Sequence, residues 1–260
     1  MLSLSLALLM VVTPETEQVR RMVLTDCISS SQAVPGQLRM VHVMFRHGDR
    51  TPISHYPTDP WADPHHWPVG PGQLTSIGKR QHFLLGQWLR QTYGGGRLLG
   101  EVYSEQEVTV RSTDVDRTLM SAQANLAGLF PPTGYMKWNP DLSWQPVPVH
   151  TLPVQEDFLL SSTHSACPRL VRLREEVEAS DWLREVYREN RDLLHYLSNH
   201  TGEEIDTVLK LDWLYDTLLV EQLYNKVTRI RSCVSGLQIP LSRRYQTGLT
   251  KSFREESSRS

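Results

Sequence analysis

The sequence has few cysteines and no long apolar run, and each absence excludes a class of protein. The three cysteines, Cys27, Cys167 and Cys233, permit at most one intramolecular disulfide, and no CxxC pair or Cys/His cluster at zinc-ligand spacing occurs. No stretch of 18 apolar residues is present, so the sequence predicts no transmembrane segment. The net charge is only −2, which argues against a nucleic-acid partner. With 39% hydrophobic and 22% charged residues, the 260-residue chain is typical of a globular protein with a buried core.

The first residues have some features of an export signal. The apolar stretch 2–12 has the length of the hydrophobic part of a secretory signal, although no basic residues precede it. We interpret 1–35 as a leader or possible signal region, with a buried N-terminal strand or helix as the alternative. Asn199-His200-Thr201 is a glycosylation sequon in an exported protein.

Two apolar segments have the character of strands. The segment 38–45 is almost continuously apolar and ends at a charged, glycine-containing cluster, which predicts a strand buried on both faces. The segment 107–111 alternates like a short strand. Each is followed by a helical pattern, and the order strand, helix, strand, helix predicts an α/β fold with a parallel sheet.

The two helical patterns have defined ends. Thr75 is expected to open the first helix, which three consecutive glycines at 94–96 end. Thr113 is expected to cap the second helix. The residues predicted to form the apolar face of the first helix are Ile77, Leu84, Leu85, Trp88 and Leu89. Those predicted for the second helix are Val115, Leu119, Ala122, Leu126 and Leu129.

The remaining segments differ in character. The segment 52–72 is rich in proline and histidine and is expected to be a solvated loop. The segments 169–198 and 205–227 are helical and predict an addition beside the sheet. The segment 229–260 carries seven basic and two acidic residues without apolar periodicity, and we interpret it as a basic, divergent, solvated tail. A function in binding acidic partners through this tail is an alternative.

The residues that indicate chemistry lie directly after the first predicted strand. Arg46 and Arg50 flank His47 there, and ligands of open α/β sheets bind beyond the carboxyl ends of strands. Guanidinium groups bind phosphate or carboxylate oxygens as bidentate donors. Arg111 ends the second predicted strand where the next helix begins. These residues predict an oxyanion pocket in which His47 can attack phosphorus.

The segment 46–52 has the form R-H-G-x-R-x-P, and in this it resembles the signature of the histidine acid phosphatases. The segments 110–132, 143–151 and 215–217 are similar to the lysosomal and prostatic type of this family. The similarity covers roughly 38–225. It implies a phosphoglycerate-mutase-like, three-layer α/β fold, so we interpret 36–228 as a histidine acid phosphatase domain.

The resemblance also implies a mechanism and its residues. Phosphate monoesters would be hydrolysed through a phosphohistidine, without metal or cofactor, with His47 as the nucleophile. Arg46, Arg50 and Arg111 match the arginines that hold phosphate, and Asp49 would have a structural or hydrogen-bonding role. Lysosomal or secreted localisation, a homodimer, and pairing of Cys167 with a later cysteine are further implications.

The sequence departs from the family pattern in one respect. The family completes its site with a His-Asp pair that supplies the general acid, but none of the ten histidines is followed by aspartate. We therefore expect an incomplete domain, truncated before that motif. The alternative function is a catalytically impaired or inactive phosphatase-like protein. If a substitute acid exists, the candidates are Asp49, Asp114 and Asp116.

Overall fold

The structure, a computed structural model, describes residues 38–161, 168–226 and 230, and it divides into two units. Unit 1 contains the described residues of Met1–Ile53 and Pro64–Arg188, and unit 2 contains those of Ser54–Asp63 and Glu189–Ser260. The 46–52 motif therefore lies in unit 1. The leader, the three cysteines and nearly all of the predicted tail lie outside the described residues.

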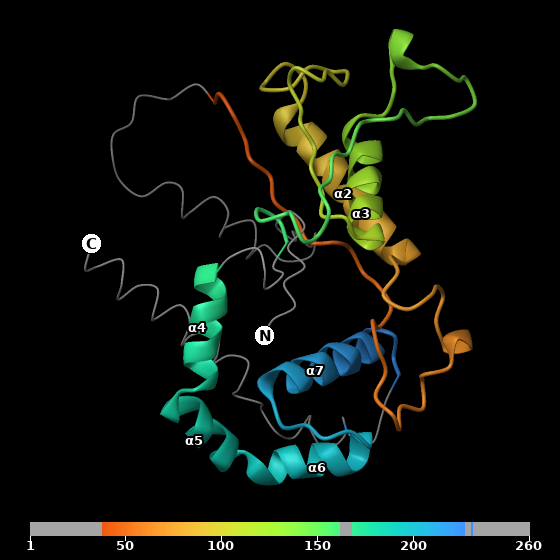
Figure 1. Cartoon of the computed structure of the whole chain (residues 1–260). Helices are drawn as coiled ribbons and strands as arrows, with labels where there is room; N and C mark the ends of the chain where they lie inside the picture. The colour runs from red at the N-terminus through yellow and green to blue at the C-terminus, as the bar shows by residue number, and fades with distance from the viewer. Residues whose placement is uncertain (1–37, 162–167, 227–229, 231–260) are drawn as a thin grey trace. The chain divides into compact units, whose positions relative to one another are not determined.

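Two helices of unit 1, α2 (Ser76–Tyr93) and α3 (Asp116–Leu129), pack along each other (Figure 1). Glycines make this close approach possible. A methyl group on Gly86 would collide with the carbonyl oxygen of Asn125, and one on Gly128 would collide with that of Phe83. The two backbones are therefore in direct contact at these positions.

Helix α2 has the predicted ends but not the predicted buried face. Thr75 caps it by accepting a hydrogen bond from the Gly78 amide, and Gly94 follows its last residue. The predicted apolar face is wrong for Ile77, Leu84 and Trp88, which are exposed, whereas Leu89 is buried as expected. The residues that α2 buries are Gly78, His82, Gly86 and Leu89.

Helix α3 begins later than predicted. Its N-cap is Val115, which makes no side-chain capping bond. The predicted cap, Thr113, instead places its hydroxyl 2.9 Å from that of Thr118. In the predicted apolar stripe, Ala122 and Leu126 are buried, as expected.

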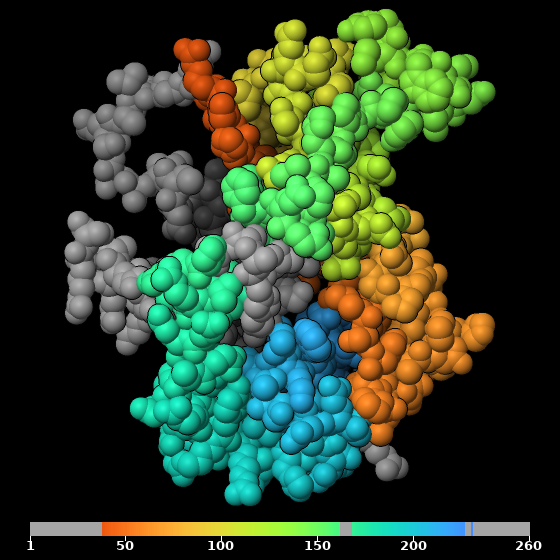
Figure 2. Space-filling model, in the orientation of Figure 1, coloured from red at the N-terminus to blue at the C-terminus, as the bar shows by residue number. Residues whose placement is uncertain are grey.

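The segment 38–45 is covered on one side only. Phe45 is buried, whereas Leu38, Met40 and Met44 are exposed, so the prediction of burial on both faces is wrong. The segment is coloured red to orange in Figure 2. Within the described ranges no extended strand forms. Isolated bridges join Arg50 with Leu74 and Arg111 with His150, the second in parallel orientation.

The predicted helical addition consists of shorter helices than expected. The segment 169–198 is divided among three of them, α4 (Pro168–Glu178), α5 (Asp181–Glu189) and α6 (Arg191–Thr201). The segment 205–227 contains α7 (Val208–Leu223). Two short 3-10 helices, η1 (Pro64–His66) and η2 (Gly134–Met136), complete the described elements. Unit 2 has its own core, formed by Tyr56, Leu197, Ile205, Leu214, Leu218 and Ile230. In the part of the chain that the structure describes, no helix combines the length and apolar character needed to cross a bilayer.

Candidate active site

The loop 46–50 is held by side chains of α2, α3 and the residue that caps α2. The Gly48 amide donates to Ser121 Oγ at 3.1 Å, and the Asp49 amide donates to Gln81 Oε1 at 2.8 Å. Thr75 Oγ1 donates to Asp49 Oδ2 at 2.5 Å, which confirms the hydrogen-bonding role expected of Asp49. The helices α2 and α3, together with the N-cap residue of α2, therefore fix the loop around His47.

A glycine contact adds to this attachment. A methyl group on Gly48 would lie 2.5 Å from the carbonyl oxygen of Gly78, so the loop backbone rests on the first turn of α2. Beyond the loop, the Thr51 amide donates to the Gln73 carbonyl at 3.2 Å. The loop is thus secured on both sides of Asp49.

His47 is buried, with 7% of its surface exposed. Its Nδ1 lies 2.8 Å from the Gly48 carbonyl oxygen, which can only accept. Nδ1 therefore carries the proton in the neutral ring, and the lone pair is on Nε2. Burial lowers the pKa of His47 to about 3, and the hydrogen bond that Nδ1 donates to the Gly48 carbonyl opposes this shift. The imidazole is neutral at any pH well above that value.

Positive charge surrounds this neutral ring. Arg46, Arg117 and Arg50 each lower the pKa of His47 further by electrostatic repulsion. Arg50 is buried, with 5% exposed, and donates to the Thr51 carbonyl at 3.1 Å. Arg46 is exposed and Arg117 is half-buried. The structure thus brings both predicted arginines of the motif close to His47 and adds a third from α3.

Arg111, the remaining predicted residue, is held by a carboxylate. Its Nη2 donates to Asp157 Oδ1 at 2.6 Å, and the Asp157 side chain is completely buried. The Leu160 amide donates to the same oxygen at 3.0 Å. Arg111 Nε is buried and makes no hydrogen bond with any described residue, so it remains available to an acceptor such as an anion oxygen.

A second buried histidine lies behind the loop. The ring of His82 packs 4.9 Å from that of Phe45, measured between centroids, and burial lowers the pKa of His82 to about 4. A hydrogen bond with the Arg46 backbone opposes this shift. His82 therefore contacts the backbone of Arg46, directly before His47, and its imidazole is also neutral well above that pKa.

The geometry around His47 combines an uncharged, oriented imidazole with several guanidinium groups, which suits nucleophilic attack on an anionic centre. The described residues that could together hold a metal ion, His55, Asp59 and Glu221, belong to unit 2 and not to this loop.

A family model described as histidine phosphatase superfamily (branch 2) matches residues 37–228. The chain belongs to this superfamily. Histidine phosphatases of this superfamily have an α/β fold, so the coarse fold class predicted from the sequence is supported by membership, while the sheet is not seen among the described residues.

Curated relatives of this chain are acid phosphatases by name. Lysosomal acid phosphatase of Homo sapiens is 49% identical over 188 residues, which are 72% of this chain and 44% of the relative. Prostatic acid phosphatases of Bos taurus and Homo sapiens are 46% and 44% identical over 191 residues, which are 73% of this chain and 48% of each relative. The chain therefore spans less than half the length of these relatives.

Three residues around the candidate site were missed in the sequence analysis. Arg117 follows Arg111 by six positions, and a second arginine in that segment was the available signal. Asp157 and Ser121 had no such signal, because their contacts with Arg111 and Gly48 join segments far apart in the chain.

Proposed function

We propose that this chain carries the phosphate-transfer half of an acid phosphatase site and hydrolyses phosphate monoesters through a phosphohistidine at His47. The observation that carries the proposal is the state of His47. The ring is buried, fixed on the Gly48 carbonyl and neutral, and it lies among arginines.

The proposed reaction has two steps. His47 Nε2 attacks phosphorus, the N–P bond forms as the P–O ester bond breaks, and the alcohol oxygen leaves with the electron pair and takes up a proton. Water then attacks the phosphohistidine, which releases phosphate and restores the neutral ring. Arg46 and Arg50 would stabilise the negative charge on the phosphoryl oxygens in both steps.

Burial of His47 also supports activity at acidic pH. A histidine with its ordinary pKa of 6.5 would be protonated in acid and could not attack phosphorus. Because burial lowers the pKa of His47 to about 3, Nε2 keeps its lone pair in moderately acidic solution. The proposed nucleophile therefore stays competent where an exposed histidine would not.

Arg111 is proposed as a third phosphate ligand. Asp157 occupies its Nη2, and the buried Nε without a hydrogen bond among the described residues is the group that an incoming phosphate oxygen could satisfy. In this arrangement Asp157 orients Arg111 and does not itself touch the substrate.

The proposal extends to the setting of the domain. We assign 36–228 to the phosphatase domain and place 38–45 and 107–111 in a parallel-rich sheet. The names of the relatives support a lysosomal or secreted protein. An exposed Asn199 in α6 is compatible with glycosylation of its sequon, and a homodimer is part of the same proposal.

The nucleophile can be tested by trapping. Phosphohistidine survives alkali, so the full chain is mixed with a ³²P-labelled monoester and quenched in base. We expect label on the unmodified chain and none on His47→Ala, whereas His65→Ala, which removes an exposed histidine, keeps it. Thermal melting in the absence of substrate establishes that each variant folds. Label retained by folded His47→Ala would refute the assignment.

A second candidate, phosphate binding with impaired turnover, is favoured by the absence of a His-Asp dipeptide from the sequence. General acids typically contribute about 10²- to 10⁴-fold. Nitrophenolate leaves with little protonation, but an alkyl alkoxide requires it. Nitrophenyl phosphate should therefore be hydrolysed much faster than glycerol phosphate if the acid is missing. Equal rates would show that a substitute acid is present.

A further inference from the structure

Unit 2 brings one imidazole and two carboxylates together. Donor atoms of His55, Asp59 and Glu221 all lie within 4.8 Å of one another. The Asp59 side chain and the whole of Glu221 have no exposed surface, and the His55 side chain is 16% exposed. We propose that these three side chains bind a divalent transition-metal ion, with Zn²⁺ as the best match.

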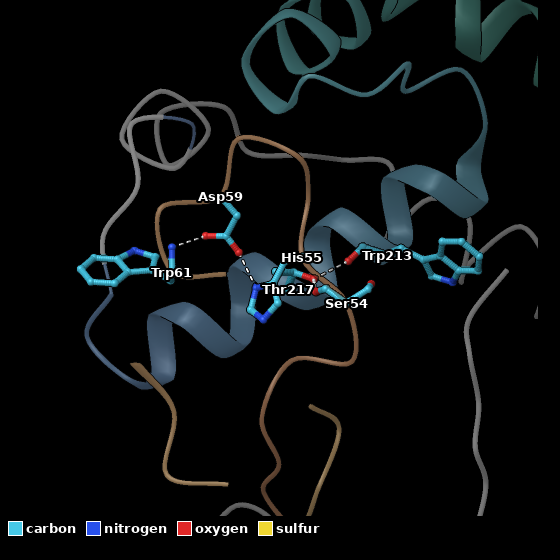
Figure 3. Close-up of polar contacts among 6 residues, drawn as sticks. All are labelled: Ser54, His55, Asp59, Trp61, Trp213 and Thr217. Carbon is cyan, nitrogen blue, oxygen red and sulfur yellow. Dashed lines mark hydrogen bonds and ion pairs between the residues drawn. The ribbon is translucent and has the colours of Figure 1, made fainter. Parts of the chain in front are cut away.

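The local backbone explains why the three residues meet. Thr217 Oγ1 in α7 donates to the Ser54 carbonyl at 3.0 Å, which fixes the start of the 54–63 loop on α7 (Figure 3). Glu221 follows Thr217 by four residues and so lies on the same face of the helix, one turn further on. His55 follows Ser54 directly and therefore reaches the face that carries Glu221.

The loop itself orients Asp59. The Asp59 amide donates to the Tyr56 carbonyl at 3.0 Å and closes a turn that places Asp59 beside His55. The Trp61 amide donates to Asp59 Oδ1 at 2.7 Å, so the other oxygen, Oδ2, faces His55 Nδ1 at 2.5 Å (Figure 3). Asp59 Oδ1 thus accepts a hydrogen bond from the backbone, and Oδ2 lies beside His55.

The donor set indicates which ion fits. Mg²⁺ and Ca²⁺ prefer oxygen ligands, whereas imidazole nitrogen with carboxylate oxygen suits Zn²⁺. Zinc lies about 2.0–2.2 Å from such donors, so neighbouring donor atoms of a tetrahedral site are separated by about 3.3 Å. Entry of the ion would move His55 Nδ1 and Asp59 Oδ2 apart by somewhat less than about 1 Å and draw Glu221 inward. Side-chain rotation suffices for such shifts.

The burial of both carboxylates, Asp59 and Glu221, also favours a bound cation. Aspartate and glutamate are rarely buried completely unless they are paired or coordinate a metal. A divalent ion held by the three donors would bring two positive charges to the two buried carboxylates. The ion would link the 54–63 loop to α7, and Glu221 lies more than 150 positions after His55 and Asp59 in the sequence. Its role would be structural and independent of the His47 chemistry.

Calorimetric titration with ZnCl₂ tests the proposal. The full chain is first alkylated with iodoacetamide, so that Cys27, Cys167 and Cys233 cannot bind the ion. We expect one saturable site and a rise in melting temperature, because the ion binds the folded chain. His55→Gln and Glu221→Gln should each weaken binding by about tenfold or more. His195→Gln, which removes an exposed histidine of the same unit, should leave binding unchanged.

A measurement on the unmodified sequence covers the case in which a buried variant does not fold. Zn²⁺ should slow the reaction of His55 with diethylpyrocarbonate, followed by peptide mass spectrometry, and leave the rate at His195 unchanged. The proposal is overturned if no saturable site exists, if folded His55→Gln and Glu221→Gln bind as tightly as the unmodified chain, or if Zn²⁺ does not protect His55.

Discussion

Replacing Asp157 by asparagine would change the ion pair that holds Arg111 while keeping the shape of the side chain. In the structure, Asp157 Oδ1 accepts from Arg111 Nη2 at 2.6 Å and from the Leu160 amide at 3.0 Å. The asparagine oxygen can still accept both bonds. The substitution therefore removes the negative charge with little change of packing.

The size of the effect follows from burial. Removing one partner of a buried ion pair typically costs about 3–5 kcal/mol. Here Arg111 is 30% exposed, and the asparagine retains an acceptor, so solvent and the remaining hydrogen bond offset part of the loss. We expect Asp157→Asn to lower the free energy of unfolding by about 2 kcal/mol. For a domain of this size that corresponds to a decrease in melting temperature of about 4–8 °C.

Thermal melting with and without phosphate measures both consequences. Because Arg111 would no longer be held in one orientation, the rise in melting temperature caused by phosphate should be smaller in Asp157→Asn than in the unmodified chain. Asp181→Asn is the matched control, since it removes the charge of an exposed partner of Arg184 and should change neither quantity.

A double-mutant cycle identifies the partner of Asp157. If the ion pair with Arg111 causes the loss, Asp157→Asn should be less damaging in an Arg111→Gln background, with a coupling energy of about 1 kcal/mol or more. The reasoning is refuted if Asp157→Asn leaves both the melting temperature and the phosphate-induced rise unchanged, or if the two substitutions are simply additive.

Three further substitutions test the packing and protonation around the site. The pKa of His82 is lowered from 6.5 to about 4 in the folded chain, so the unfolded chain takes up this proton at higher pH, and acidification between these values destabilises the fold. His82→Gln should reduce this loss of stability by up to about 1.4 kcal/mol per pH unit, measured by urea unfolding at several pH values. An unchanged pH dependence would contradict the assignment. Ser121→Ala leaves the Gly48 amide without its acceptor, so it should lower the free energy of unfolding by about 1–3 kcal/mol and reduce the phosphate-induced rise in melting temperature. If neither quantity changes, the hydrogen bond from Gly48 to Ser121 does not hold the loop. Gly86→Ala should destabilise the chain by about 1–3 kcal/mol in chemical unfolding, because the added methyl collides with α3. Gly70→Ala, in open surroundings, should be neutral, and equal stability of the two variants would argue against close packing of α2 and α3.

The ends of α2 were predictable from the sequence, but most of its buried face was not. Thr75 caps α2 because a hydroxyl before a helix accepts from its first turn, which is a local property. The buried face of α2 depends instead on where Gly86 lets α3 approach. A pattern based on hydrophobicity gives weight to Ile77 and Trp88 and none to glycine, so it selected the exposed side.

In the candidate site too, residues close together in the sequence could be recognised, whereas contacts between distant segments could not. Arg46, His47 and Arg50 could be recognised together because they are adjacent in the sequence, and the structure places both arginines where they affect the pKa of His47. Asp157 could not be recognised, since its contact with Arg111 depends on tertiary structure. For the same reason the sequence did not predict that 38–45 would be covered on one face only.

Two backbone hydrogen bonds directly after the 46–50 loop hold the ends of the next segment together. The Thr51 amide donates to the Gln73 carbonyl at 3.2 Å, and the Gly72 amide donates to the Pro52 carbonyl at 2.7 Å. The intervening segment 53–71 therefore forms a loop whose two ends are joined by backbone hydrogen bonds, which we call the neck of the loop. Changes of length or composition within that segment are confined beyond the neck and need not displace His47. Since Tyr56 belongs to the core of unit 2, the exposed stretch 62–66 is the place where new sequence could be inserted, by evolution or by design, while the geometry of the motif is kept.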